Sequence, residues 1–349
     1  MIETAPSPRG LRTVRRRLAG WAMGVAAVAA AGQALAWGGT GHRMIGELAV
    51  EALPQSVPEF LRTQQAAADV AELAREPDRW RGAGKVHDNM RDPAHFLDVD
   101  DQGRILGGPQ LSDLPPTRTD YDAALRAAGT DSAKAGYLPY AIIDGWQQLA
   151  KDFAYWRADV AGEEREKDGK KRAWLIADRI RRERQTILDL GVWAHYVGDA
   201  SQPLHLSVHY NGWGEGPNPK GYTTQRIHVS FEGPFVVANV TADAVRAKVK
   251  PPFVCHCSIE RRTAAYLERT NATVIPFYEL EKAGGFMGGD PRGVDFAAER
   301  IAAGVDELRD MVVDAWNASA TGTVGYPSTS VADIEAGKAD AYAVLYGSD

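Results

Sequence analysis

The sequence predicts a mainly helical protein that folds as a single compact domain with long loops. Apolar residues recur at helical spacing through most of the chain, and two long segments are dense in glycine and proline. The sequence contains no internal repeat. Of its 349 residues, the 313 that follow position 36 are enough for one large domain. We therefore expect a domain over residues 37–317 and a C-terminal tail over residues 318–349.

Four segments show the helical periodicity most clearly. The first, "GHRMIGELAVEAL", places Met44, Ile45 and Leu48 on one face. The other three are "AIIDGWQQLAKDFAYW" (141–156), "RQTILDLGVWAHYVGDA" (184–200) and "DFAAERIAAGVDELRDMVVDAWNA" (295–318). The last is the longest. Each of the four predicts an amphipathic helix with one buried face.

The segments between these helices carry turn signals. "DDQGRILGGPQLSDLPPTRT" (100–119) and "YNGWGEGPNPKGYTT" (210–224) are rich in glycine and proline, which predicts loops. The charged run "EEREKDGKKR" (163–172) is typical of a solvated helix end or turn. Helical periodicity is lost after Trp316, so the last residues are expected to form a loosely packed tail.

The first 36 residues have the pattern of an export signal. An arginine-rich segment precedes the apolar run "WAMGVAAVAAAG", and Ala34-Leu35-Ala36 forms a small-x-small cleavage pattern. The apolar run is too short to span a bilayer comfortably. We expect cleavage after Ala36 and a periplasmic or secreted protein. The arginines in "VRRRLAG" match a twin-arginine signal weakly, so the choice between the Sec and twin-arginine routes stays open.

The charge and the cysteines limit the possible functions. Loss of residues 1–36, which hold five arginines and one glutamate, would change the formal charge from −6 to −10. Such an acidic protein lacks a broad basic surface for a nucleic-acid backbone, so phosphate binding would have to be local. Cys255 and Cys257 have no partner cysteines that would complete a metal-ligand pattern. They are expected to be free or paired locally, without a catalytic role.

Histidines and carboxylates are unevenly placed, and one segment concentrates them. In "WAHYVGDASQPLHLSVH", His195 and Asp199 are four residues apart on a predicted helix, so both side chains can converge on one cation. Pro203 ends the helix, and His205 follows. A histidine and carboxylate at this spacing are equally often a hydrogen-bonded surface pair.

His228 and Glu232 repeat the four-residue spacing in "QRIHVSFEG", but the local pattern is ambiguous. Ile227, Val229 and Phe231 alternate with polar residues, which predicts a strand. In a strand the two side chains would stand roughly 13 Å apart, whereas on a helix the rise between them is about 6 Å. Propensity favours the strand, and only a shared metal ion would favour the helix.

Four more residues complete the candidate set: His42 at the start of the first helix, Asp78 and Arg81 in "REPDRWRG", and His95 in "DPAHFLDVDD". Each taken singly is more often structural, for example as a helix cap, a packed imidazole or a solvated charge. Together with the two pairs and His205 they form a nitrogen and oxygen ligand set without thiolates, which suits zinc. Eight ligands are too many for one zinc ion and fit two or three.

This ordered ligand set resembles the superfamily that joins the single-strand-specific zinc nucleases with the bacterial zinc-dependent phospholipases C. The members begin their mature chain with tryptophan and carry a helix with His-x3-Asp followed by Gln-Pro-x-His. This chain has Trp37 and "HYVGDASQPLH" (195–205) at those positions. The resemblance covers residues 37–232, roughly two-thirds of the expected mature chain, and implies the helical fold of that superfamily.

The resemblance implies a site for three zinc ions. Trp37, through its free amino group and main-chain carbonyl, would bind one zinc with His42 and Asp199. Asp78, His95 and His195 would bind a second, with Asp199 bridging the two. His205, His228 and Glu232 would bind the third. Cleavage after Ala36 would then create a metal ligand. A cluster of three dications would also form a local positive site in an acidic protein.

The implied reaction is hydrolysis of a phosphate ester. Asp78 would orient or deprotonate the attacking water, and Arg81 would neutralise charge that develops on the phosphoryl oxygens. Phe96 and Trp213 are candidates for substrate binding, because a nucleobase needs a stacking partner and a choline headgroup an aromatic cage. Phe96 is equally compatible with a core position.

The resemblance divides between its two branches. Trp-Gly-x-x-Gly-His at 37–42 and Asp-x-x-Arg at 78–81 are similar to the nucleases. Arg226-Ile227 before His228 departs from the Asn-Leu of the nucleases, and Glu232 as the last ligand is similar to the phospholipases. We expect first a nuclease that acts on single-stranded DNA or RNA and 3'-nucleotides, and second a phospholipase C that acts on phosphatidylcholine-like lipids at a membrane surface. A non-catalytic metal-binding protein is the third interpretation. No obligate protein partner is implied.

Overall fold

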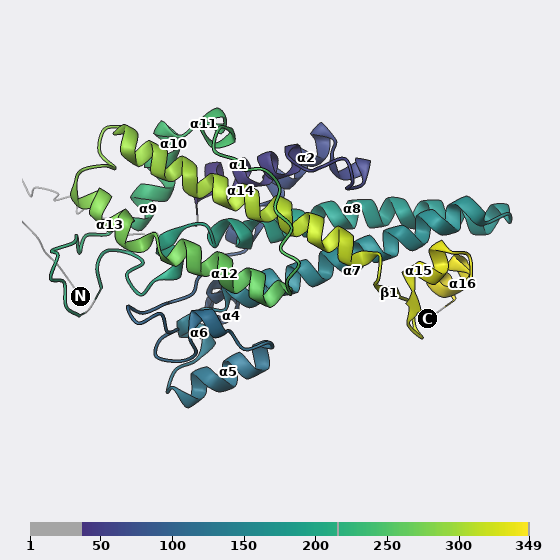
Figure 1. The fold of residues 1–349 in the computed structure, drawn as a ribbon, viewed down its shortest axis with the longest axis horizontal. Helices are drawn as coiled ribbons and strands as arrows, with labels where there is room; N and C mark the ends of the chain where they lie inside the picture. The colour runs from purple at the N-terminus through teal and green to yellow at the C-terminus, as the bar shows by residue number, and fades with distance from the viewer. Residues whose placement is uncertain (1–36, 215, 348–349) are drawn as a thin grey trace, which may run out of the picture. The chain divides into compact units, whose positions relative to one another are not determined.

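The structure is a computed structural model that describes residues 37–214 and 216–347. The predicted export signal, residues 1–36, lies outside the described residues. The prediction of a mainly helical fold is confirmed (Figure 1). The longest elements are α1 (Gly38–Glu51), α7 (Leu138–Arg165), α8 (Gly169–Asp199), α12 (Ile259–Asn271) and α14 (Pro291–Ser319). No helix among the described residues is both long and apolar enough to cross a membrane.

Shorter helices fill the connections. They are α2 (Gln64–Leu73), α3 (Glu76–Arg79), α4 (Lys85–Arg91), α5 (Arg118–Ala127), α6 (Ser132–Ala135), α9 (His228–Ser230), α10 (Val236–Asn239), α11 (Ala242–Arg246), α13 (Val274–Lys282), α15 (Val331–Glu335) and α16 (Ala341–Tyr346). Single helical turns lie at η1 (Glu59–Leu61), η2 (Asp92–His95), η3 (Leu111–Asp113), η4 (Pro203–Leu206) and η5 (Phe231–Phe235).

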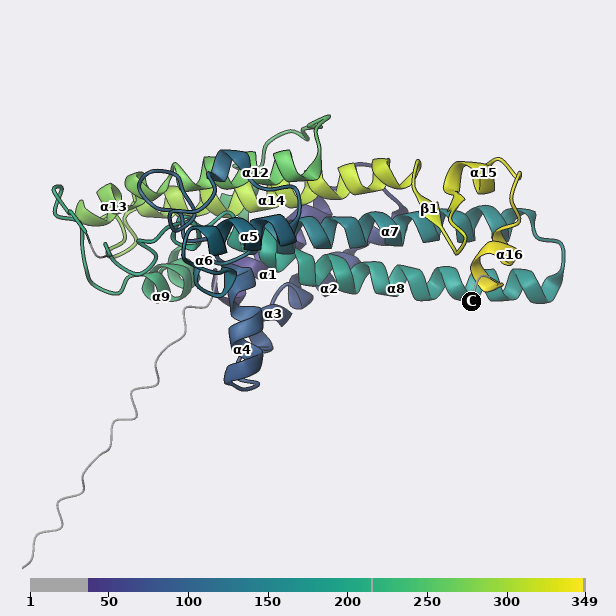
Figure 2. The same ribbon diagram turned by 90° about the horizontal axis from the view of Figure 1, so that it is seen from below.

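Helices α7 and α8 form an antiparallel pair that packs against α14 (Figures 1 and 2). Their ends follow from local sequence. Pro139 stands in the first turn of α7, where its missing N–H costs nothing, and Asp168 caps α8 by accepting bonds from the Lys170 and Lys171 amides at 2.8 and 3.0 Å. The charged run 163–172 thus contains the turn between the helices, as predicted.

Helix α1 packs against both α8 and α14, and small residues let it approach. A Cβ atom on Gly198 would lie 3.1 Å from His42 Nδ1, and one on Gly41 would lie 2.8 Å from Trp37 Cβ. Glycine at these two positions therefore brings the start of α1 directly against the C-terminal end of α8. Trp37 and Ile45 are fully buried at this junction, within the main hydrophobic core.

The segment around His228 is helical, as the implied third zinc site requires, and the strand that local propensity favours does not form. Residues 228–230 form α9, and Phe231–Phe235 continues as a π-helical turn that contains Pro234. Phe231 packs its ring 4.9 Å from that of Phe277 and 5.7 Å from that of Trp37. Tertiary packing of this aromatic face outweighs the local strand propensity.

The C-terminal segment is packed, contrary to the expected loose tail. Strands β1 (Thr323–Val324) and β2 (Thr329–Ser330) pair antiparallel, and α15 and α16 follow. Val324, Val331 and Ile334 are buried in a second small core with alanines of α7. The sequence lacks a long period here because its elements are too short to show one.

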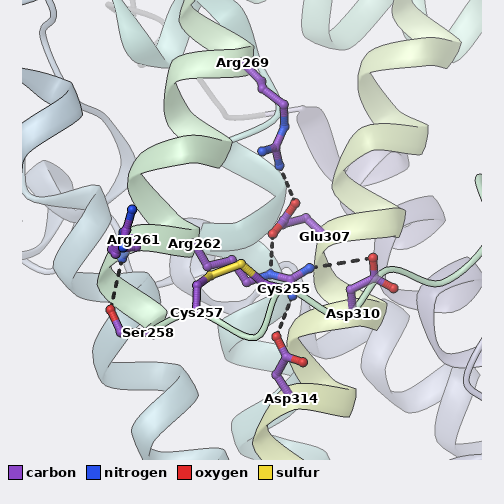
Figure 3. The surroundings of a disulfide bond; sticks show 9 residues. All are labelled: Cys255, Cys257, Ser258, Arg261, Arg262, Arg269, Glu307, Asp310 and Asp314. Atoms are coloured by element: carbon purple, nitrogen blue, oxygen red, sulfur yellow. Dashed lines mark hydrogen bonds and ion pairs between the residues drawn. A yellow bond between two sulfur atoms is a disulfide. The ribbon is translucent and has the colours of Figure 1, made fainter.

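The two cysteines form a disulfide with each other, which is one of the two states expected for them (Figure 3). The bridge closes a short loop at the start of α12, next to a buried cluster of charges. Arg262 donates to Glu307 at 2.6 Å and to Asp314 at 2.5 Å, which ties α12 to α14.

Candidate metal centre

Three groups of histidine and carboxylate side chains converge in the structure. They are His42, His195 and Asp199; Asp78, His95 and His195; and His205, His228 and Glu232. Within each group the potential ligand atoms lie within 4.8 Å of one another. The eight side chains predicted as ligands are therefore all brought into these groups, although they come from α1, α3, η2, α8, η4, α9 and η5.

Asp199 joins the first two groups through its two oxygens. Its Oδ1 lies 3.4 Å from His42 Nε2, while its Oδ2 lies 3.0 Å from His95 Nδ1 and 3.3 Å from His195 Nε2. Oδ1 of Asp199 thus faces the imidazole of His42, and Oδ2 faces those of His95 and His195. This is the arrangement that a bridging carboxylate between two cations requires.

The third group is built on one helical turn plus His205. His228 Nε2 lies 2.6 Å from Glu232 Oε1, and His205 Nε2 lies 3.1 Å from the same oxygen. Gln202 Nε2 also donates to this carboxylate. Because α9 and η5 are continuous helix, the i and i+4 side chains share a face.

Main-chain carbonyls orient two of the imidazoles. His195 Nδ1 lies 2.8 Å from the Ala74 carbonyl oxygen, and His205 Nδ1 lies 2.5 Å from the His95 carbonyl oxygen. In these contacts the Nδ1–H group donates to the carbonyl oxygen, which leaves the lone pair of Nε2 available to a metal ion. Metal-binding histidines in proteins are commonly held in this way.

Buried polar atoms without hydrogen-bond partners indicate that the site fits cations. Within the described residues these atoms include both ring nitrogens of His42, Asp199 Oδ1, Asp78 Oδ1 and Glu232 Oε2. His42 and Asp199 are fully buried. A buried polar atom without a partner costs free energy, and metal ions would satisfy these lone pairs.

The pKa shifts divide the histidines of the cluster. Burial lowers the pKa of His42 well below its ordinary value and lowers that of His95 to about 3, so both imidazoles are neutral. Burial alone would lower the pKa of His195 and of His205, but Asp199 and the other neighbouring carboxylates outweigh it, so the pKa of His195 is raised and that of His205 is raised to about 9. Zinc binding would therefore displace a proton from these two imidazoles.

Burial alone would raise the pKa of Asp199, but the neighbouring His195 and His205 outweigh it and hold that pKa well below its ordinary value. Neutral imidazoles and ionised carboxylates are the forms that bind zinc.

Asp78 and Arg81 lie together at the edge of the cluster. Arg81 Nε lies 3.6 Å from Asp78 Oδ1 and 3.6 Å from Asp92 Oδ1, and the side chains of Asp78 and Arg81 are only 13 and 12 % exposed. Burial raises the pKa of Asp78. Asp78 lies inside α3, so it is not the helix cap that its position beside Pro77 suggested as an alternative.

Trp37 lies at the cluster, but its expected role rests on the resemblance. Its indole Nε1 donates to Ser201 Oγ at 2.8 Å and to the Gly198 carbonyl oxygen at 3.0 Å. The Trp37 side chain thus contacts residues on both sides of Asp199. Its carbonyl accepts the amide of Gly41 at 3.1 Å. Binding of zinc by the Trp37 amino group stays a prediction.

The two aromatic candidates have different surroundings. Phe96 is half-buried and lies close to Gly136, where a Cβ atom would be 2.9 Å from Phe96 Cδ2. Trp213 is 8 % exposed and stacks on His209, with ring centroids 3.7 Å apart. The aromatic rings of Tyr222 and Tyr278 also surround Trp213.

Sequence reasoning missed several residues that frame the cluster. Asp92 approaches Arg81, and the Tyr196 ring lies 5.5 Å from the rings of both His95 and His195. Tyr196 lies within the quoted helix motif, directly after His195, so its position beside the cluster was available from the sequence. Asp92 carried no signal because its contact depends on the turn from α4 into η2.

Comparison with known proteins gives distant structural matches. No family model and no curated protein sequence matches the chain. Among solved structures, the α-toxin of Clostridium absonum matches with 14 % identity and a TM-score of 0.43, over 82 % of this chain and 67 % of that one. The α-toxin of an avian strain of Clostridium perfringens matches with 16 % identity and a TM-score of 0.35, over 84 % of this chain and 69 % of that one.

Proposed function

We propose that this protein is an exported, zinc-dependent hydrolase of phosphate esters. The observation that carries the proposal is the Asp199 carboxylate, whose two oxygens face two groups of buried imidazoles while a third group lies around Glu232. A donor set of nitrogen and oxygen without thiolates suits zinc, and three groups suit three ions.

The residues divide into ligands and reacting groups. His42 and Asp199, with the amino group and main-chain carbonyl of Trp37, would hold one zinc. Asp78, His95 and His195 would hold a second together with Asp199, and His205, His228 and Glu232 would hold a third. Bound zinc lowers the pKa of water and polarises phosphoryl oxygens. Asp78, at the edge of the cluster, would orient the attacking water and accept its proton. Arg81 would neutralise charge on the phosphoryl oxygens.

Two substrate classes agree with this chemistry, and one observation favours phospholipid. Helix α4 stands out from the helical body between α3, which carries Asp78, and η2, which carries His95 (Figure 2). Val86 and Met90 on α4 are 82 and 66 % exposed, and their i and i+4 spacing places them on one face. An exposed apolar rim beside the site is expected of an enzyme that works at a lipid surface. Single-stranded nucleic acid is the other candidate.

The test uses protein that begins at Trp37. Elemental analysis should give about three zinc ions per chain, and the protein should hydrolyse bis(p-nitrophenyl) phosphate. Parallel assays on single-stranded DNA and on phosphatidylcholine assign the substrate class. Chelation should abolish hydrolysis and added zinc should restore it. Absence of zinc after reconstitution would refute the proposal.

A further inference from the structure

The helix that carries two ligands of the third group begins without a cap of its own. Helix α9 starts at His228, and the side chain of Ile227, its N-cap residue, makes no capping hydrogen bond. The first amides of a helix have no partner within that helix, and a side chain usually satisfies one of them. The local sequence at 227–232 also favours a strand. A helix here therefore needs support from elsewhere in the fold.

Asn211 gives that support from a loop 17 residues earlier in the chain. The His228 amide donates to Asn211 Oδ1 at 3.2 Å. Asparagine is well suited to this contact, because its short side chain presents a carbonyl oxygen to the amides of a first helical turn. His228 is both the first residue of α9 and a member of the third ligand group. The bond from Asn211 thus fixes the main chain of a ligand directly.

A close approach of two backbones brings this loop to the start of α9. The Trp213 amide donates to the Thr223 carbonyl oxygen at 2.7 Å. Gly212 has a φ of +99°, and a Cβ atom there would lie 2.6 Å from the Gln225 carbonyl oxygen. Any other residue at position 212 would push the two segments apart. Glycine therefore lets the preceding side chain reach the first amide of α9.

His209 anchors the same loop to the body of the protein. Its Nδ1 accepts the Gly214 amide at 3.0 Å, and its Nε2 donates to Asp101 Oδ1 at 3.0 Å. The Tyr278 hydroxyl donates to the His209 carbonyl oxygen. The Trp213 ring stacks on the His209 imidazole with centroids 3.7 Å apart. Contacts with α13 and with the loop around Asp101 thus hold this loop in one position.

The His228 imidazole lacks the support that two other ligand imidazoles have. His195 Nδ1 and His205 Nδ1 each contact a main-chain carbonyl oxygen. His228 Nδ1 is buried without a hydrogen-bond partner. The direction of this ring therefore depends on the position of its own main chain and on Glu232. Because groups that orient a ligand strengthen metal binding, the contact that fixes this main chain gains importance.

We propose that Asn211 is a positioning residue of the third zinc site. By holding the His228 amide it keeps this turn helical, so that the His228 and Glu232 side chains stay on one face and bind one ion. Asn211 acts through the main chain of a ligand, not on the ion itself. The inference rests on the proposed function.

The test measures the affinity of each zinc ion in protein that begins at Trp37, by competition with a chromogenic chelator. Asn211→Ala removes the acceptor at a half-buried position. It should weaken one of three ions about tenfold and leave the other two unchanged, since loss of a group that orients a ligand commonly weakens metal binding by about 10- to 100-fold. Asn211→Asp retains an acceptor oxygen beside the helix start and should stay within about twofold of wild type.

Asn218→Ala is the matched control, because Asn218 lies in the same loop and also binds main chain. Its Nδ2 donates to the Tyr222 carbonyl oxygen at 2.8 Å, and its Oδ1 accepts the Tyr222 amide at 2.8 Å. This variant should keep all three zinc affinities. Amide hydrogen exchange of the zinc-free proteins adds a readout without metal. Asn211→Ala should speed exchange at residues 228–235 about tenfold, and Asn218→Ala should not.

Glu232→Gln separates the ligand from the residue that positions it. Glu232→Gln by itself should remove the third ion, so adding Asn211→Ala should change the affinities of the two remaining ions by less than about twofold. Three results would overturn the positioning role: unchanged zinc affinity in Asn211→Ala, an equal loss in Asn211→Asp, or an equal loss in Asn218→Ala.

The inference and the proposed function fail in different ways. If Glu232→Gln loses one ion while Asn211→Ala loses no affinity, the positioning role alone is refuted. If Glu232→Gln keeps the full zinc content, the third zinc site itself is refuted. If Asn211→Ala weakens one ion but the wild type hydrolyses no phosphate ester, the proposed function alone is refuted.

Discussion

His228 Nε2 lies 2.6 Å from Glu232 Oε1, across one turn of continuous helix. This contact decides whether a third metal group exists, because a strand would separate the two side chains by roughly 13 Å. The same carboxylate oxygen lies 3.1 Å from His205 Nε2. Glu232 is thus the centre of one ligand group, as Asp199 is the centre of the two others.

Replacement of these two carboxylates should remove different numbers of ions. Glu232→Gln should lower the zinc content by about one ion per chain, whereas Asp199→Asn should lower it by about two, because Asp199 faces two groups. Elemental analysis of the purified variants measures both. Glu268→Gln, at an exposed position on α12, is the control and should keep the full content. Equal losses from the two variants would contradict a bridging role for Asp199.

The amino group of Trp37 should contribute to one zinc site. A protein with one alanine added before Trp37 should bind about one zinc fewer than the protein that begins at Trp37, because a peptide nitrogen has its lone pair in amide resonance. Quantitative zinc analysis of the two proteins, prepared side by side, checks this. The same zinc content in both would show that the Trp37 amino group is not a ligand.

Asp78→Asn should separate catalysis from metal binding. The asparagine keeps an oxygen for the metal but cannot accept a proton, so kcat for bis(p-nitrophenyl) phosphate should fall by about 100-fold or more while most zinc is retained. Asp113→Asn, at an exposed position on η3, should have wild-type activity. If Asp78→Asn is as active as the wild type, the non-catalytic interpretation of this residue gains support.

Asp159 should make the folded protein less stable as the pH rises. It is fully buried on α7, and burial, with the nearby Asp178, raises its pKa to about 8. The unfolded chain releases this proton near pH 4 and the folded protein retains it, so the stabilising contribution is complete below about pH 4 and is lost as the pH rises to about 8. Asp159→Asn should therefore gain up to about 4 kcal/mol relative to wild type between pH 5 and pH 8, at about 1.4 kcal/mol for each pH unit.

Urea unfolding of both proteins at pH 5 and pH 8 measures this difference. The comparison of wild type with variant at each pH cancels the pH dependence of zinc binding, which both proteins share. A difference that is the same at both pH values would show that Asp159 is ionised in the folded protein.

Gly145→Ala should destabilise the fold near the metal centre. The new Cβ would lie 2.1 Å from Trp193 Cδ1, so the indole must move and the cost should be about 1–3 kcal/mol. Gly169→Ala in the first turn of α8 meets no atom within 4 Å and should be neutral or slightly stabilising. Denaturant unfolding of the two variants checks both values, and equal stability would contradict the tight packing of Trp193.

The helical class and much of the site could be predicted from the sequence, because both depend on short-range spacing. His195 and Asp199 share a face wherever the segment is helical, and the apolar period of 184–200 makes it helical. At 227–232 the helix required by a shared metal ion forms in place of the strand that propensity favours, because packing of Phe231 against Phe277 and Trp37 overrides local propensity. The packed C-terminal segment was missed because β1, β2 and α15 are too short for a periodic signal.

The sequence by itself determined which chemical groups are available: imidazoles and carboxylates in a fixed order, without thiolates, on amphipathic helices. Only the tertiary structure decided which of them meet. His95 and Asp199 are 104 residues apart and lie 3.0 Å from each other. Local sequence governs contacts within a helical turn, but contacts across the chain depend on how α1, α7 and α8 pack together, and that packing is a property of the whole core.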